Sequence, residues 1–210
     1  MNSMRLIIPT FIFIVIGSCS NHKDNKTIVA ASIDTVSVNK DSLKTQQLIK
    51  DYDLNRTDTF DVGDVDADGR MDTAFINPLK FFFHNGQIDS QYVNISFTAN
   101  VNPIKHYNGF QGIVVNAGDL DGNKTDEVIY LPDWYQSNSA MFYIYGYKKQ
   151  KWVQFTKGEI RRDIAREQKD ELAFLKSRVK KINNGSFKLT EHIMKDTEFV
   201  DSTRIILIDQ

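Results

Sequence analysis

A fifteen-residue pattern occurs twice in the chain, and it constrains the fold more than any other feature. The first copy spans residues 62–76 and the second spans residues 117–131, so the two align without a gap at an offset of 55 residues. Both copies carry oxygen-bearing side chains at the first, third, fifth and ninth positions of a loop, and a short apolar run follows each loop. The pattern therefore predicts two similar units, each consisting of a loop and a strand.

The spacing of the oxygen-bearing side chains predicts a calcium site in each loop. Calcium takes 6–8 oxygen ligands at about 2.3–2.6 Å, and a tight loop can direct alternate side chains at one point. The seventh position would offer a backbone carbonyl, and glycine at the sixth position permits the positive φ of a sharp turn. We expect the ligands to be Asp64, Asp66, Asp68, Arg70 and Asp72 in the first loop, and Asp119, Asp121, Asn123, Thr125 and Glu127 in the second.

The alternative is a turn rich in Asp and Gly that binds no metal. Four carboxylates of the first loop lie within nine residues, and Arg70 is the only cationic residue among them. At about 5 Å and an effective dielectric constant near 20, each pair of carboxylates repels by about 3 kcal/mol, which a bound cation would relieve. The second loop carries less charge and has Lys124 at the sixth position. We therefore expect the first loop to bind metal more firmly.

The flanks of the loops distinguish between two classes of calcium site. An EF-hand requires an acidic residue at position 12, where this chain has Phe75 and Tyr130. Short apolar runs that lead to Pro78 and Pro132 follow the loops instead, which is typical of strands. Over residues 55–155 the chain resembles the FG-GAP/VCBS repeats, whose calcium loops join strands in β-propeller blades of the integrin α-chain type.

This resemblance implies a mainly β fold of blade-like antiparallel units that resemble a partial β-propeller. Two repeats cannot close a ring, which needs at least four blades, so we expect a compact β domain such as an open sandwich of two sheets. Periodicity predicts further strands at residues 80–84, 91–99, 112–116, 141–147 and 151–155. Toward the C-terminus it predicts one helix over residues 159–177, a hairpin over residues 178–190 with an Asn-Gly turn, and a closing strand at residues 203–208.

The N-terminus predicts export and lipid attachment. The apolar run of residues 6–16 is too short to span a membrane, which takes about 20 helical residues, but suits a signal peptide. Ile16-Gly17-Ser18-Cys19 follows and resembles the lipobox of bacterial lipoproteins. An ordinary signal peptide with a cysteine there by chance is the alternative. Ser20 implies the outer membrane, with the periplasmic or surface face left open, and two short Asp-Ser/Thr segments near residues 34–43 resemble a Bacteroidota glycosylation signal.

These features divide the chain into four parts. We expect a signal peptide over residues 1–18, a lipidated cysteine and polar tether over residues 19–45, the two calcium loops in a β domain over residues 46–156, and an extension of helix and hairpin packed on it over residues 157–210. The tether is polar with few large apolar groups, which suits a flexible linker.

The sequence favours binding over catalysis. It has neither a Gly-x-Ser-x-Gly elbow nor a His-Glu-x-x-His motif, and a net charge of −1 argues against a nucleic-acid ligand. We expect a calcium-stabilised, non-catalytic binding module for a protein or glycan, with Trp134 and Tyr135 as candidate ligand contacts. An envelope polysaccharide hydrolase or its accessory subunit, and a purely structural envelope lipoprotein, are the alternatives.

Overall fold

The computed structural model describes residues 50, 56–77, 80–84, 87–107, 109–133 and 137–209. These residues form antiparallel strands in three sheets, none of them closed, and two helices, so the prediction of a mainly β chain is confirmed. The elements in chain order are β1 (Asp58–Gly63), β2 (Asp72–Ile76), β3 (Lys80–His84), β4 (Gln87–Phe97), β5 (Ile104–Tyr107), β6 (Phe110–Gly118), β7 (Glu127–Asp133), β8 (Ser139–Lys148), β9 (Lys151–Arg161), α2 (Arg162–Arg166), α3 (Glu171–Ser177), β10 (Val179–Asn183), β11 (Ser186–Lys195) and β12 (Glu198–Leu207).

The first two sheets share the order of four strands, and the first has β3 as a fifth. In the first, β1 pairs with β2, β2 pairs with β4, and β5 pairs with the opposite edge of β4, while β3 continues along the edge that β2 occupies. In the second, β6, β7, β8 and β9 follow one another. Each of these two antiparallel sheets begins with a strand, a predicted calcium loop and a second strand. The third sheet has the order β10, β11, β12.

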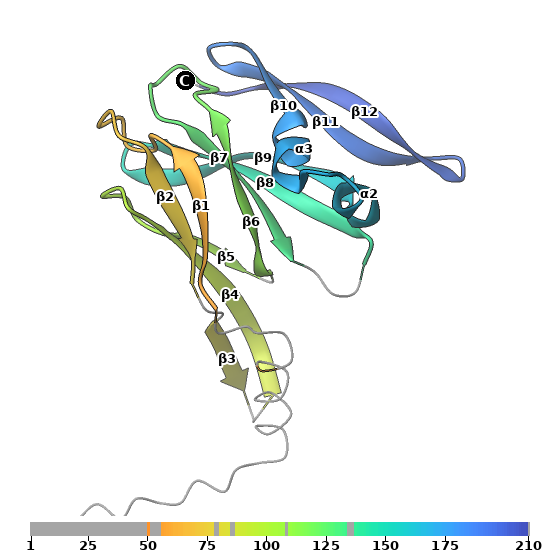
Figure 1. The fold of residues 1–210 in the computed structure, drawn as a ribbon, viewed down its shortest axis with the longest axis horizontal. Helices are drawn as coiled ribbons and strands as arrows, with labels where there is room; N and C mark the ends of the chain where they lie inside the picture. The colour runs from red at the N-terminus through yellow and green to blue at the C-terminus, as the bar shows by residue number, and fades with distance from the viewer. Residues whose placement is uncertain are drawn as a thin grey trace, which may run out of the picture. The chain divides into compact units, whose positions relative to one another are not determined.

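The second sheet is the middle layer of the described residues (Figure 1). One of its faces packs against the first sheet through Val114, Val128 and Tyr130, and the other packs against α2, α3 and the third sheet through Ile129 and Leu131. Strand β7 is consequently buried on both faces, which explains its nearly continuous apolar sequence.

The C-terminal part differs from the single helix predicted over residues 159–177. Residues 159–161 belong to β9, where Arg161 pairs with Ser139 of β8. Two short helices follow, and α3 starts at a new N-cap, where the Asp170 side chain accepts a hydrogen bond from the Ala173 backbone N–H at 2.9 Å. The single-helix prediction was wrong because this cap begins a second helix after a break at residues 167–170.

Strand β7 continues through Pro132, where the sequence predicted a stop. Register between β6 and β7 is broken between Phe110 and Ile113, directly opposite this proline. A proline cannot donate to the ladder, and it is tolerated where a bulge interrupts pairing. Cys19, Pro78, Trp134 and Tyr135 lie outside the described residues.

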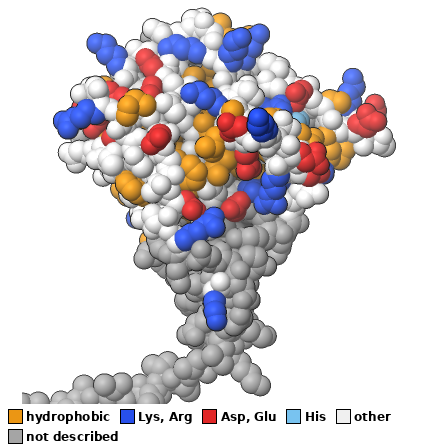
Figure 2. All heavy atoms as spheres, in the orientation of Figure 1, with side chains coloured by type: hydrophobic (Ala, Val, Ile, Leu, Met, Phe, Trp, Pro, Cys, Tyr) orange, Lys and Arg blue, Asp and Glu red, His pale blue; other side chains and the backbone are white. Residues whose placement is uncertain are grey.

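The surface and the helices complete this description. Figure 2 shows acidic and basic side chains interspersed on the face it presents, which agrees with the net charge of −1. Within the described part of the chain, no helix has the length and apolarity needed to cross a membrane.

An aromatic cluster surrounds His106 between the first two sheets. The His106 ring lies 4.3 Å from the ring of Tyr143 and 5.1 Å from that of Tyr130, centroid to centroid. Its Nδ1 lies 3.0 Å from the Tyr145 hydroxyl. Burial lowers the pKa of His106 to about 4, so the ring is neutral at neutral pH.

We expect His106→Gln to make the fold less sensitive to acid. Between pH 6.5 and about 4, the unfolded chain binds a proton at His106 that the folded chain does not bind, so stability is fully present above pH 6.5 and falls with pH in this window. Because the ring is partly exposed, we expect the wild type to lose only about 1–2 kcal/mol more than the variant. Urea unfolding across this pH range measures the difference, and identical pH slopes for the two chains would contradict it.

Candidate functional site

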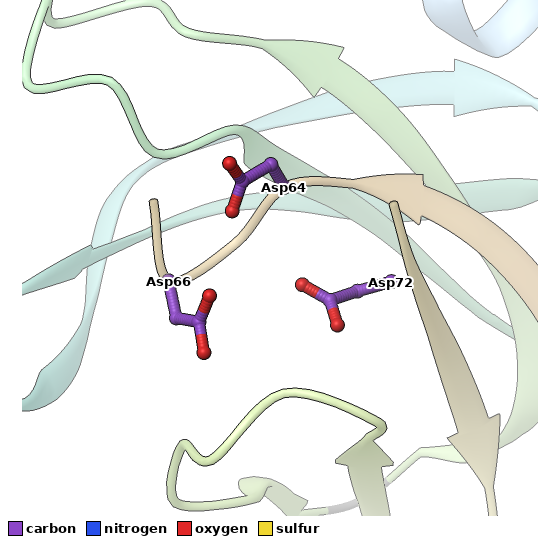
Figure 3. A group of neighbouring side chains, drawn as sticks. All are labelled: Asp64, Asp66 and Asp72. Atoms are coloured by element: carbon purple, nitrogen blue, oxygen red, sulfur yellow. The ribbon is translucent and has the colours of Figure 1, made fainter. Parts of the chain in front are cut away.

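Three aspartate side chains of the first loop point toward one another (Figure 3). Asp64 and Asp66 lie in the loop between β1 and β2, and Asp72 is the first residue of β2. One carboxylate oxygen from each residue lies within 4.8 Å of the others. Such a set of hard, anionic oxygens is the ligand type that calcium prefers.

Backbone hydrogen bonds hold this loop in shape. The Asp64 carboxylate accepts from the backbone N–H groups of Asp68 at 3.1 Å and Gly69 at 2.8 Å. The buried Asp72 carboxylate accepts from the Val65 N–H at 3.1 Å and from the Thr98 hydroxyl at 2.8 Å. These donors fix the carboxylates and partly offset their negative charge.

The second loop repeats the main contacts of this geometry at equivalent positions. The Asp119 carboxylate accepts from the Lys124 N–H at 3.3 Å, as Asp64 does from Gly69, and the Glu127 carboxylate accepts from the Leu120 N–H at 2.5 Å, as Asp72 does from Val65. Oxygens of Asp119, Asp121 and Glu127 also lie within 4.8 Å of one another. The offset of 55 residues found in the sequence therefore corresponds to one local structure formed twice.

The two loops differ in the cations that surround them. Lys148 of β8 forms an ion pair with Asp121 at 3.2 Å, and Lys181 of β10 lies 3.9 Å from an Asp119 carboxylate oxygen and donates to the Asp119 carbonyl. In the first loop, by contrast, Arg70 pairs with Asp68 at 3.2 Å, which lies outside the converging trio. A metal at the second loop would compete with Lys148 for Asp121, and within the described chain the trio of the first loop has no such competitor.

Glu127 is the most strongly perturbed acid of the site. Its side chain is fully buried, and its Oε1 atom has no hydrogen-bond partner among the described residues. Burial is the main reason that the pKa of Glu127 is raised to about 8; the hydrogen bond from Leu120 opposes this rise, and the negative charges of Asp121 and Asp119 add to it. A cation held by the three carboxylates would favour the ionised form.

The pairing of strands explains the difference between Glu127 and Asp72. The register of β4 on β2 and of β8 on β7 makes Tyr145 the counterpart of Thr98. The Thr98 hydroxyl donates to Asp72, whereas the Tyr145 hydroxyl contacts His106. The second loop thus lacks the donor that satisfies the buried acid of the first.

The remaining predicted ligands lie beside the trios. The Asp68 carboxylate accepts from the Arg70 N–H at 2.8 Å as well as pairing with its guanidinium, and the Arg70 side chain is exposed. The Asn123 side-chain oxygen accepts from both the N–H and the hydroxyl of Thr125, each at 2.6 Å. Their role as ligands stays a prediction.

Asp126 connects the two loops and was not identified from the sequence. Its N–H donates to the Asp64 carbonyl at 2.6 Å, and its Oδ2 accepts from the Asp64 N–H at 3.2 Å and from the Asn116 amide at 3.1 Å. A Cβ at Gly63 would lie only 1.9 Å from that Oδ2, which together with a φ of +81° explains the glycine. The one signal in the sequence is an extra acid, since the first copy has Met71 at this position.

We expect Lys124→Gly to stabilise the chain by about 1 kcal/mol, because a residue with a Cβ is strained in the left-handed conformation. Lys124 has a φ of +75°, close to the +84° of Gly69 in the first loop. The turn geometry is therefore kept in the second loop, with strain that glycine would relieve. Thermal unfolding measures the change. Lys149→Gly in the hairpin turn, where φ is +50°, is the control, because it measures the relief of the same backbone strain outside the calcium loops. A Lys124→Gly chain that is less stable than the wild type would contradict the expectation.

Comparison with protein-family models, with curated proteins and with solved structures finds no match to this chain.

Proposed function

We propose that the chain is a membrane-anchored, calcium-stabilised lipoprotein of the bacterial envelope or surface, whose β domain is a non-catalytic binding module. The observation that carries the proposal is the convergence of Asp64, Asp66 and Asp72 on one point, with the same arrangement repeated at the second loop. Three carboxylates held this close are costly without a cation, and a divalent ion would offset that cost.

The fold supports kinship with repeats of the FG-GAP/VCBS type. The first sheet has five strands and the second has four, and the order β1, β2, β4, β5 in the first matches the order β6, β7, β8, β9 in the second. Each sheet joins its first two strands through the same type of loop. Both also carry a register shift immediately before the loop, between Asp61 and Gly63 and between Asn116 and Gly118. We infer that the two sheets are blade-like units of a partial propeller, with the third sheet covering the second.

Calcium would act in this protein as a structural ion. Extracellular calcium modules bind at about 10⁻⁴ to 10⁻³ M, so the sites would be filled outside a cell. In each loop the ion would tie the end of one strand to the start of the next. Addition of calcium to chelator-treated chain tests this part, and an unchanged melting temperature would remove it.

Lipid on Cys19 is the second part of the proposal, and it rests on the lipobox-like Ile16-Gly17-Ser18-Cys19. We expect Cys19→Ser to abolish incorporation of labelled palmitate when the chain is expressed in a bacterium that processes lipoproteins. Two or more acyl chains give stable anchoring, so the variant should also leave the membrane fraction. Ser18→Ala, which keeps the residue small, is the control and should remain labelled. Palmitate still incorporated into Cys19→Ser would contradict the assignment.

A further inference from the structure

A cavity of about 410 Å³ lies where β5 of the first sheet meets β7 and β8 of the second. His106 and Tyr107 line it from β5, and Pro132, Ser139 and Tyr143 line it from the second sheet. Ligand sites favour such junctions between packed units, and this volume is within the range of small-molecule pockets, about 300–1,000 Å³. None of the residues of the two aspartate loops lines it.

The described walls of this cavity are neutral. The described lining residues are aromatic, hydroxyl-bearing or apolar, the apolar ones being Pro132, Ala140 and Met141. His106 is the one titratable base among them, and its burial lowers its pKa to about 4. Two acids next to lining residues are already engaged: Glu159 accepts from the Ser139 hydroxyl at 2.5 Å, and Asp133, which follows Pro132, pairs with Arg162 at 2.6 Å. A charged ligand would therefore find no free counter-charge on the described walls.

The cavity combines aromatic faces with hydrogen-bonding groups that are not used inside the protein. The Tyr143 hydroxyl has no hydrogen-bond partner among the described residues, although its ring packs on His106. His106 uses Nδ1 toward Tyr145, and no described residue engages its other ring nitrogen. Tyr107, 57% exposed, presents an aromatic ring at the rim. A purely apolar ligand would leave the polar groups without partners, which costs about 1–3 kcal/mol for each buried group.

We propose that this cavity binds one neutral sugar residue of a glycan. Ser137 also lines the cavity, and its hydroxyl, which accepts from the Ser139 N–H at 3.0 Å, can still donate. The C–H face of a pyranose ring would lie on the aromatic rings, and its hydroxyls would bond to Tyr143, His106 and Ser137. A sugar matches the walls because it is uncharged, has an apolar face and carries several hydroxyls. The inference rests on the proposed function as a binding module and names its ligand class.

The test is calorimetric titration of the full-length chain with neutral oligosaccharides. The chain is kept in a detergent without a sugar headgroup, since a maltoside would compete for the site. The probes are tetramers of glucose, mannose, galactose and N-acetylglucosamine, with tetragalacturonate as the acidic comparison. We expect at least one neutral tetramer to bind, and to bind more tightly than tetragalacturonate.

Three variants locate the binding. We expect Tyr143→Phe, which removes only the hydroxyl, and Tyr107→Ala, at the rim, each to weaken binding about 5-fold or more, the equivalent of one lost hydrogen bond or ring contact. Tyr147→Ala is the matched control, because Tyr147 lines a different cavity, beside the second loop, and it should bind as the wild type does. Melting temperatures confirm that each variant is folded.

Each outcome decides between this inference and the function on which it rests. No binding of any neutral tetramer, preference for tetragalacturonate, or equal binding by the wild type and Tyr143→Phe would overturn the sugar site. A chain that gains thermal stability from calcium but binds no tetramer retains the calcium-stabilised domain and loses only the sugar inference. If sugar binding depends on Tyr143 but calcium does not change the thermal stability of the chain, the sugar site is retained and the calcium-stabilised domain is lost.

Discussion

Calcium at about 10 mM is expected to raise the melting temperature of chelator-treated chain by about 3–10 °C. Dissociation constants of about 10⁻⁴ to 10⁻³ M correspond to about 1.4–2.7 kcal/mol of added stability at that concentration. For a chain of this size, each kcal/mol shifts the melting temperature by about 2–4 °C. The physical reason is relief of the repulsion among carboxylates that the fold holds within 4.8 Å of one another.

Single substitutions should rank the ligands. Asp66→Ala is expected to remove most of the calcium response, because Asp66 belongs to the trio without a competing lysine. Asp68→Ala should have an intermediate effect, since its carboxylate is paired with Arg70, and Asp121→Ala a smaller one, because Lys148 already neutralises Asp121. Asp61→Ala, on the exposed side of β1, is the control. Equal losses from Asp61 and Asp66 would show that the response does not come from the loop.

Glu127→Gln is expected to have opposite effects with and without calcium. In chelator-treated chain, the substitution removes the need to bury a carboxyl group whose Oε1 has no partner among the described residues. We expect about 1–2 kcal/mol of added stability at neutral pH, below the limit implied by a folded-state pKa of about 8. In the presence of calcium, the variant should lose the stability that calcium binding at the second loop contributes, because an amide is a weaker ligand than a carboxylate.

The equivalent residue of the first loop provides the control. Both oxygens of Asp72 accept hydrogen bonds, from the Val65 N–H and from the Thr98 hydroxyl. Asp72→Asn would place an amide donor against one of these donors, so it should destabilise the chelator-treated chain by about 1–2 kcal/mol. Urea unfolding of both variants, with calcium and with chelator, measures the four differences. Destabilisation of the chelator-treated chain by Glu127→Gln would contradict the account of Oε1.

Local features of the sequence predicted the local structure well. The two loops, the strands that flank them and the Asn-Gly hairpin between β10 and β11 depend on residues close together in the chain, so spacing alone identifies them. Strand β7 running through Pro132 was not predicted, because its tolerance depends on a bulge in β6, a neighbour in space. The break between α2 and α3 was missed because the apolar spacing of residues 159–177 masked the cap at Asp170.

The environment of the candidate site was less predictable for the same physical reason. Lys148 and Lys181 reach the second loop from β8 and β10, which are distant in sequence. Nothing in the spacing of the loop indicates that these lysines neutralise it. Asp126 likewise accepts a hydrogen bond from Asp64, which lies 62 positions earlier in the chain. Ligand types follow from the loop pattern, whereas the competition for them follows from how the sheets pack.

The link between Asp64 and Asp126 has a consequence for how the domain opens. Both the N–H and the carbonyl of Asp64 are bonded to Asp126, so the first sheet cannot detach from the second without breaking both bonds at the base of the loops. Amide hydrogens on both sides of this junction should therefore exchange with solvent through one shared opening event. The two repeats, similar in sequence, would then behave in unfolding as one cooperative unit.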